Sequence, residues 1–339
     1  MSSDTSRSPM SRPAVVAWLV VGMAAVSTAA ILARIAMGTD PGIVTAGEGA
    51  APALAIAFWR TTLGSLALAP AAWRAQRRTT TPLTRRRQLQ LGLAGVALAL
   101  HFVLFQGALT LTSVASTVTL TTMSPLFVAL GGWWLLGERT ARRAWAGMAA
   151  TVLGALLIGF GDATSIALGT QALIGDIMAL GAALAGSAYL LAGRRARRDT
   201  ATSTYAAIVY GAAGVLLLPL CLATGTDLTG FSTTTWLAIA GIVIGPQLLG
   251  HTVFNLLLAT LPATTVAIAI LAEPVGAGLL AWLLLGELPA PLFAVGAPLV
   301  LLGVAVVIRA NGGGAGDDPA PPAPLRRAAG GSGVPRPRR

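Results

Sequence analysis

Glu273 is the residue with the most evident chemistry, because it is an acidic side chain deep inside an apolar stretch of the sequence. Burial removes the hydration of a charge, so an ionisable residue in such a setting is a functional candidate by default. Glu273 could carry a proton in one conformation and lose it in another, or it could bind the amine of a substrate. The alternative is a protonated packing residue. Pro274, which follows it, lacks a backbone donor and could loosen a helix there.

Three polar residues, Gln247, His251 and Asn255, follow one another at intervals of four in another apolar stretch. Residues four apart lie on the same face of an α-helix, so this spacing predicts a polar stripe. A polar stripe on a helix in lipid should turn away from the lipid, and we interpret it as the lining of a cavity. Hydrogen bonding that only holds helices together is the alternative. We expect His251 within roughly 5 Å of Glu273 in depth.

Four further polar residues lie in apolar stretches: His101, Gln106, Ser124 and Arg60. His101 is a second candidate for the role of His251. Arg60 could attract a carboxylate, or its long side chain could reach the headgroups of the membrane. Ser124 belongs to a hydroxyl-bearing face, although such hydroxyls most often bond to their own helix.

The sequence lacks the patterns of several other kinds of site. It contains no lysine and therefore no P-loop, and it has no HExxH motif, paired membrane carboxylates or nucleophile elbow. We expect neither an enzyme nor a bound metal or cofactor. The net charge of +11 comes from arginine alone, in short clusters between apolar stretches. This arrangement does not predict binding to nucleic acid.

The elements that must position these residues are apolar runs of about 20 residues, each long enough to cross a bilayer. The sequence is 55% hydrophobic and 10% charged, which excludes a soluble fold of this size. We predict ten transmembrane helices near residues 14 to 36, 51 to 73, 89 to 109, 114 to 136, 143 to 160, 172 to 193, 203 to 223, 235 to 258, 263 to 285 and 290 to 308.

Arginine positions predict the orientation of these helices. With the N-terminus inside, every arginine except Arg34 and Arg60 falls in an inside segment. The positive-inside rule therefore predicts a multi-pass protein of the cytoplasmic (plasma) membrane with both termini in the cytoplasm. Residues 1–13 are expected to form a cytoplasmic N-terminus. Residues 309–339, rich in Gly, Pro, Ala and Arg, are expected to form a disordered cytoplasmic tail.

The chain also repeats itself at a shift of 149 residues. This register aligns Phe105 with Phe254, Gln106 with Asn255, Pro125 with Pro274, Trp133 with Trp282, Gly137 and Glu138 with Gly286 and Glu287, Gly147 with Gly296, and Gly154 with Gly303. The sequence is therefore a duplication of a five-helix unit. An odd number of helices per unit inverts the second copy, which is a recurrent basis of alternating access.

The stretch from Phe105 to Gly159, with Ser124-Pro125-Leu126 and Leu136-Gly137-Glu138, resembles the EamA repeat of the drug/metabolite transporter (DMT) superfamily. The second copy has the similar motifs Glu273-Pro274-Val275 and Leu285-Gly286-Glu287. The resemblance implies ten helices, cytoplasmic termini and the movement of small metabolites or amino acids, often export. It also implies a central cavity lined mainly by the first four helices of each half, with the fifth and tenth helices peripheral.

These observations together predict an all-α membrane protein with ten transmembrane helices as two inverted five-helix repeats, residues 14–160 and 161–308. The expected function is secondary transport, and the expected partners are a small-molecule solute, the lipid bilayer and protons. Translocation of a lipid-linked substrate is the alternative function. The sequence does not determine the oligomeric state, and a homodimer is one alternative.

Overall fold

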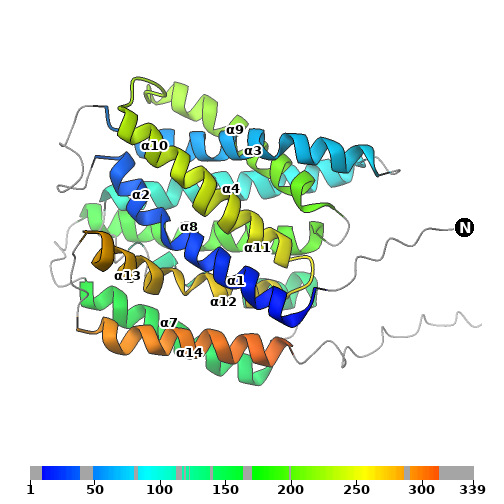
Figure 1. The fold of residues 1–339 in the computed structure, drawn as a ribbon, viewed down its shortest axis with the longest axis vertical. Coiled ribbons are helices and arrows are strands. Elements are labelled where there is room, and N and C mark those ends of the chain that lie inside the picture. Colours follow the sequence, from blue (N-terminus) through cyan, green and yellow to red (C-terminus); the bar gives the residue numbers. More distant parts are fainter. Residues whose placement is uncertain are drawn as a thin grey trace, which may run out of the picture.

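The structure is a computed structural model that describes residues 10–38, 49–79, 83–111, 117, 120–121, 123–137, 140–162, 170–197, 200–285 and 291–312. Within these ranges the secondary structure is helical, with no strand (Figure 1). The helices of the first half are α1 Arg12–Ser27, α2 Ala29–Ala36, α3 Ala53–Arg77, α4 Arg85–Leu111, α6 Ser124–Gly131, η1 Gly132–Leu136 and α7 Arg142–Asp162. The helices of the second half are α8 Thr170–Ala196, α9 Thr202–Ala223, α10 Thr233–Ile242, η2 Val243–His251, α11 Thr252–Leu257, α12 Ala263–Ile270, α13 Glu273–Leu285 and α14 Phe293–Gly312.

Each of the ten predicted runs contains helix. Eight helical segments in the described ranges are long and apolar enough to cross a membrane, and Ser124–Leu136 is a shorter apolar helix. The remaining predicted run, near residues 143 to 160, corresponds to the helix α7. It continues to Asp162 and α14 continues to Gly312, so both helices extend beyond the predicted runs. The rest of the expected tail, from residue 313, lies outside the described residues, as do residues 1–9.

Several spans are not uniform α-helices, which the run lengths did not indicate. The first span is interrupted at Thr28, between α1 and α2, and the ninth at residues 271–272, between α12 and α13. The second interruption directly precedes Glu273 and Pro274. Proline cannot donate the backbone hydrogen bond that would continue α12, but it suits the first turn of a new helix. Pro125 occupies the same position at the start of α6.

The eighth span changes its helix type halfway. It begins as α10, continues as the π-helix η2, and ends as α11. In a π-helix the backbone hydrogen bonds run between residues five apart, whereas in an α-helix they run between residues four apart. The predicted polar stripe begins in η2 with Gln247 and His251 and ends in α11 with Asn255.

Packing between the helices shows the inverted repeat. Two pairs join equivalent helices of the two halves, α3 with α9 and α7 with α14, and α6 packs against α12 of the span that is equivalent to its own. The packing of α4 against α8 in one part of the bundle is matched by the packing of η2 against α1 in the other. The fold is thus two five-helix repeats related by an approximate two-fold axis. In Figure 1 the pair α7 and α14 lies along one edge of the bundle, away from α3 and α9.

The peripheral pair is held by glycines that the 149-residue register makes equivalent. A side chain at Gly154 would lie 2.6 Å from the backbone oxygen of Gly296, and a side chain at Gly296 would lie 2.6 Å from the oxygen of Gly154. Gly147 and Gly303 make the same kind of reciprocal approach. Such backbone contact between helices is typical of proteins in lipid, where small residues allow close packing.

One end of the bundle carries most of the arginines in the described residues. In Figure 1 the start of α1 and the end of α14 lie at the same end of the molecule, together with the ends of α3 and α8 and the starts of α4 and α7. The arginines at these helix ends are Arg74, Arg77, Arg78, Arg85, Arg86, Arg87, Arg142, Arg143, Arg194, Arg195 and Arg309. We call this the arginine-rich end.

Candidate functional site

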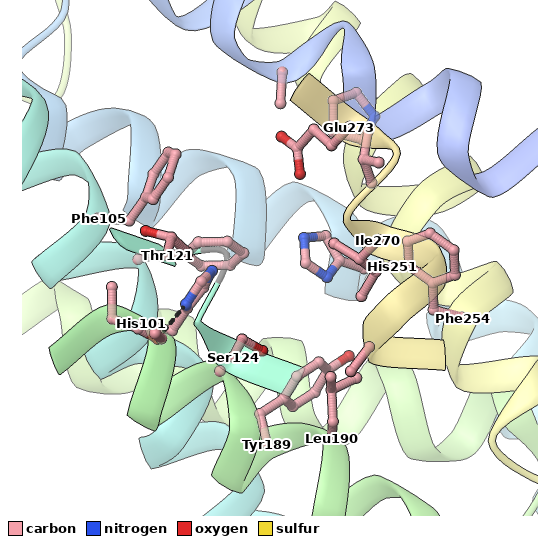
Figure 2. Close-up of a pocket in the computed structure, with 18 of the residues that line it drawn as sticks. His101, Phe105, Thr121, Ser124, Tyr189, Leu190, His251, Phe254, Ile270 and Glu273 are labelled. Carbon is pink, nitrogen blue, oxygen red and sulfur yellow. Dashed lines mark hydrogen bonds between the residues drawn. The ribbon is translucent and has the colours of Figure 1, made fainter. Parts of the chain in front are cut away.

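A cavity at the centre of the bundle is lined by both halves of the chain. It has room of about 110 Å³ for water-sized molecules. Its polar side chains come from α3, α4, α6 and a residue shortly before it, α8, η2 and α13, and Figure 2 shows most of them around one open space. The polar residues are Arg60, His101, Thr121, Ser124, Tyr189, His251 and Glu273.

Five of the eight predicted site residues therefore meet in one cavity: Arg60, His101, Ser124, His251 and Glu273. The sequence left open whether Glu273 and His251 face the same space, and Figure 2 shows that they do. The other three are buried but do not line the cavity: Gln106, Gln247 and Asn255.

The polar stripe was predicted as one face, and the structure divides it. His251 lines the cavity, while Gln247 and Asn255 turn into the contacts between helices and have no exposed surface. The physical reason is the packing around this span, because Gln247 accepts a hydrogen bond from Arg60 and Asn255 accepts one from Tyr189, while His251 packs edge-on against Phe102 at the cavity. Cavity lining was the favoured interpretation of the whole stripe, and it applies to His251. Gln247 and Asn255 instead form hydrogen bonds between helices, which was the alternative interpretation.

Arg60 is a buried cation without a carboxylate partner in the described structure. The side chain is 5% exposed, so it does not reach the headgroups. Its Nε donates to Oε1 of Gln247 at 3.0 Å, and its guanidinium carbon lies 3.9 Å from the ring centroid of Phe102. Its Nη2 has no hydrogen-bond partner. Arg60 nonetheless lines the cavity, and because a buried charge needs partners, its guanidinium is suited to a ligand that accepts hydrogen bonds there.

The partners of Arg60 belong to a hydrogen-bonded network that holds the cavity wall. Tyr210 donates to the backbone oxygen of Gln247 at 3.4 Å, and Nδ2 of Asn255 donates to the hydroxyl of Tyr210 at 3.4 Å. Tyr189 in turn donates to Oδ1 of Asn255 at 2.8 Å. Gln247 and Asn255 therefore position two cavity residues, Arg60 and Tyr189, rather than touch the cavity themselves.

Glu273 and Ser124 occupy equivalent places in the two halves, at the first residues of α13 and α6. A serine from another helix contacts the backbone at each place. Ser27 donates to the backbone oxygen of Glu273 at 3.4 Å, and Ser187 donates to that of Ser124 at 3.0 Å. Each half thus places an interrupted helix at the cavity, followed by Pro125 or Pro274.

The two histidines approach the cavity from different spans. Nδ1 of His101 lies 2.9 Å from the backbone oxygen of Ala182, which fixes that ring against α8. The ring of His251 lies edge-on to Phe102, with centroids 5.6 Å apart, and 6.3 Å from the ring of Tyr189. Both imidazoles therefore have aromatic neighbours and one open side toward the cavity (Figure 2).

Aromatic residues of the cavity were absent from the predicted site. Phe102, Phe105 and Phe254 all contribute to the lining. A signal was present, because Phe105 and Phe254 are equivalent in the 149-residue register, as are Ser124 and Glu273. Both matched pairs line the cavity, one member from each half of the chain.

The predicted structural motif is described in part. Gly137 ends η1 with φ of 68°, a conformation that glycine adopts without strain. Glu138, Gly286 and Glu287 lie outside the described residues.

Comparison with known proteins adds family and fold. Residues 14–160 and 173–309 both match the EamA-like transporter family. A Bacillus subtilis (strain 168) protein described as the uncharacterized transporter YwfM is 25% identical over 229 residues, which are 63% of this chain and 71% of that protein. A solved crystal structure of another protein superimposes with a TM-score of 0.71 at 20% identity, over 89% of this chain and 98% of the other.

The two family matches cover most of the chain, and they coincide with the two halves that the helix packing relates. The membrane-spanning helices, the duplication and the central cavity agree with a transporter. The chain belongs to the EamA-like transporter family.

Proposed function

We propose that the protein is a secondary transporter of a small zwitterionic solute, an amino acid or a close relative, which binds in the central cavity. The observation that carries the proposal is the pair of opposite charges there. Arg60 has an unpartnered Nη2, Glu273 lies in the same lining, and no ion pair joins these two described residues. A carboxylate at Arg60 and an ammonium at Glu273 would satisfy both.

Interrupted helices at equivalent positions support the same site. In transporters built from inverted repeats, discontinuous helices in corresponding places mark the region where solutes and coupling ions bind. Here α6 and α13 both begin at the cavity, one with Ser124 and the other with Glu273. Two inverted copies around one site can exchange an inward-open and an outward-open arrangement, which is the basis of alternating access.

Glu273 supports coupling to protons. Its carboxylate can bind either the ammonium of the solute or a proton, and we propose that the two bind in turn. An exporter that returns with a proton on Glu273 would exchange an outward-moving solute for an inward-moving proton. By the positive-inside rule we expect the arginine-rich end and both termini in the cytoplasm, so that an exporter would bind its solute from that end.

Counterflow in vesicles tests this function. Purified full-length protein is reconstituted into vesicles loaded with unlabelled amino acids, and uptake of labelled amino acids, their methyl esters and their N-acetyl derivatives is measured. We expect exchange of at least one free amino acid and no exchange of its two derivatives, because each derivative lacks one charge. A lumen more acidic than the outside should increase uptake, because protons leave as solute enters.

A fluorescent phospholipid in the same vesicles tests the alternative. We expect no translocation of this lipid by the protein. Translocation of the lipid without exchange of any amino acid would mean that the substrate is lipid-linked and that the proposed function is wrong.

A further inference from the structure

One wall of the cavity, formed by His101, Thr121 and Tyr189, carries polar atoms whose hydrogens are already used. These residues, which we call the acceptor wall, come from α4, from the helical residue Thr121 shortly before α6, and from α8. Figure 2 shows them on the side of the cavity away from Glu273. The hydrogen bonds within the protein decide what each of them can still offer a ligand.

His101 offers an acceptor. Its Nδ1 lies 2.9 Å from the backbone oxygen of Ala182. A carbonyl oxygen can only accept, so Nδ1 carries the hydrogen. In a neutral imidazole the other nitrogen, Nε2, then has a lone pair and no hydrogen. Figure 2 shows this second nitrogen on the cavity side of the ring, opposite the bond to the backbone.

The two hydroxyl groups of the wall are committed in the same way. Thr121 donates to the backbone oxygen of Thr117 at 2.7 Å, and Tyr189 donates to Oδ1 of Asn255 at 2.8 Å. A hydroxyl has one hydrogen, so both oxygens are left with lone pairs. Oγ of Ser124, beside them, lies 3.3 Å from Oγ of Ser187.

We propose that the transported solute is an amino acid whose side chain ends in an uncharged hydrogen-bond donor, a hydroxyl, amide or indole N–H, read by Nε2 of His101 and Oγ1 of Thr121. This inference rests on the proposed function, because Arg60 and Glu273 must first hold the carboxylate and the ammonium of the solute. The side chain of the solute then extends toward the acceptor wall.

The wall discriminates against two other kinds of side chain. An apolar side chain would bury the acceptors without supplying a hydrogen, and sites built to bond a substrate OH or NH reject analogues that lack it. The oxygens of a side-chain carboxylate would face the lone pairs of Nε2 of His101 and Oγ1 of Thr121 without a hydrogen between them. The negative charge of that carboxylate would also have no cation beside it in the wall. An amino acid with a hydroxyl or amide pairs with the wall without a change in net charge.

Pairs of amino acids of nearly equal shape test the proposal in the counterflow assay. Threonine and valine differ by a hydroxyl in place of a methyl group, and tyrosine and phenylalanine differ by one hydroxyl. For at least one pair, we expect the donor-bearing member to be exchanged about tenfold more efficiently or better. Glutamine should likewise be exchanged in preference to glutamate.

Variants assign the preference to the wall. In His101→Phe, the threonine-to-valine or tyrosine-to-phenylalanine ratio should fall close to one, because a ring remains without its acceptor. Thr121→Val is a smaller change that should lower the same ratio if His101→Phe does not fold. Thr110→Val is the matched control, since Thr110 is exposed on the same helix as His101 and bonds to its own backbone. Its ratio should stay at the wild-type value.

The outcomes separate this inference from the proposed function. If the wild-type protein exchanges valine and phenylalanine as well as threonine and tyrosine, zwitterion transport stands and the donor preference is wrong. A preference that survives both His101→Phe and Thr121→Val also overturns the assignment. Failure of the wild-type protein to exchange any free amino acid would instead contradict the proposed function.

Discussion

Replacing Arg60 with methionine is expected to reduce solute exchange by at least about 100-fold, because the carboxylate of the solute loses its only cation among the described cavity residues. Arg60→Lys should restore part of the rate, since lysine keeps the charge but lacks the planar fork that binds a carboxylate through two bonds. The measurement is the initial rate of counterflow in vesicles of equal protein content.

The same substitution, Arg60→Met, should not lower the thermal stability of the protein, although it lowers the rate of exchange. Arg60 is 5% exposed, with one hydrogen-bonded amide and one aromatic ring as its partners. A buried charge that awaits a ligand costs free energy, and an apolar side chain of similar volume often replaces such a charge without loss. We therefore expect the Tm of Arg60→Met to equal or exceed that of the wild type in detergent.

A matched arginine on the same helix is the control. Arg74 is exposed at the arginine-rich end of α3, and Arg74→Met should keep the wild-type rate of exchange. If Arg60→Met exchanged solute at a rate near that of Arg74→Met, the carboxylate of the solute would bind elsewhere. A lower Tm together with a lower rate would identify Arg60 as a structural residue.

Glu273→Gln is expected to abolish the response of uptake to a pH gradient. In the wild-type protein, uptake should rise when the lumen is more acidic than the outside, because protons leave as solute enters. Glutamine holds no exchangeable proton in this role, so the stimulation should disappear. Exchange without a gradient should also fall, by about tenfold or more, because an amide cannot pair with an ammonium as a carboxylate does.

Two further variants complete the comparison. Glu273→Asp keeps the carboxylate and should keep stimulation by the gradient at a reduced rate. Asp227→Asn removes an acidic group from the turn between α9 and α10, outside the cavity, and should behave as the wild type. Stimulation that persists in Glu273→Gln would show that the proton is carried by another group or that transport is not coupled to protons.

Much of the fold could be predicted from composition and repetition. Apolar run lengths predicted ten helical segments, and the match of Phe105 with Phe254 and of Pro125 with Pro274 predicted two copies. These features are strong because a span in lipid must satisfy its own backbone and therefore be helical. The prolines also indicated where helices could loosen, and α6 and α13 begin beside them.

The division of the polar stripe could not be predicted. Spacing places the three residues on one side of the helix, but it does not say which neighbouring side chain each of them meets. Gln247 and Asn255 meet Tyr210 and Tyr189, while His251 faces the cavity. Contacts between residues far apart in the chain decide these orientations.

The position of Arg60 was likewise beyond the sequence. A carboxylate ligand and a path to the headgroups are both compatible with an arginine about nine residues from the outer end of the predicted run 51 to 73. The choice depends on Phe102 and Gln247, which come from two other spans and leave Nη2 without a partner. Sequence identifies such a residue as a candidate, but tertiary packing decides what it faces.

The central claim is that a zwitterionic solute occupies the cavity between Arg60 and Glu273, and protection of a cavity cysteine tests it most directly. Cys221 is the single cysteine of the chain, so a Cys221→Ala background allows a cysteine to be placed at Ser124, in the cavity lining. Thr110→Cys, exposed on α4, provides the control position.

The rate of labelling by a small membrane-permeant maleimide is measured with and without an amino acid that the counterflow assay shows to be exchanged. The predicted result is that this amino acid slows labelling at residue 124 with the concentration dependence of transport, that its methyl ester does not, and that labelling at residue 110 is unchanged. Labelling at residue 124 that stays at its full rate at concentrations saturating transport would contradict the account.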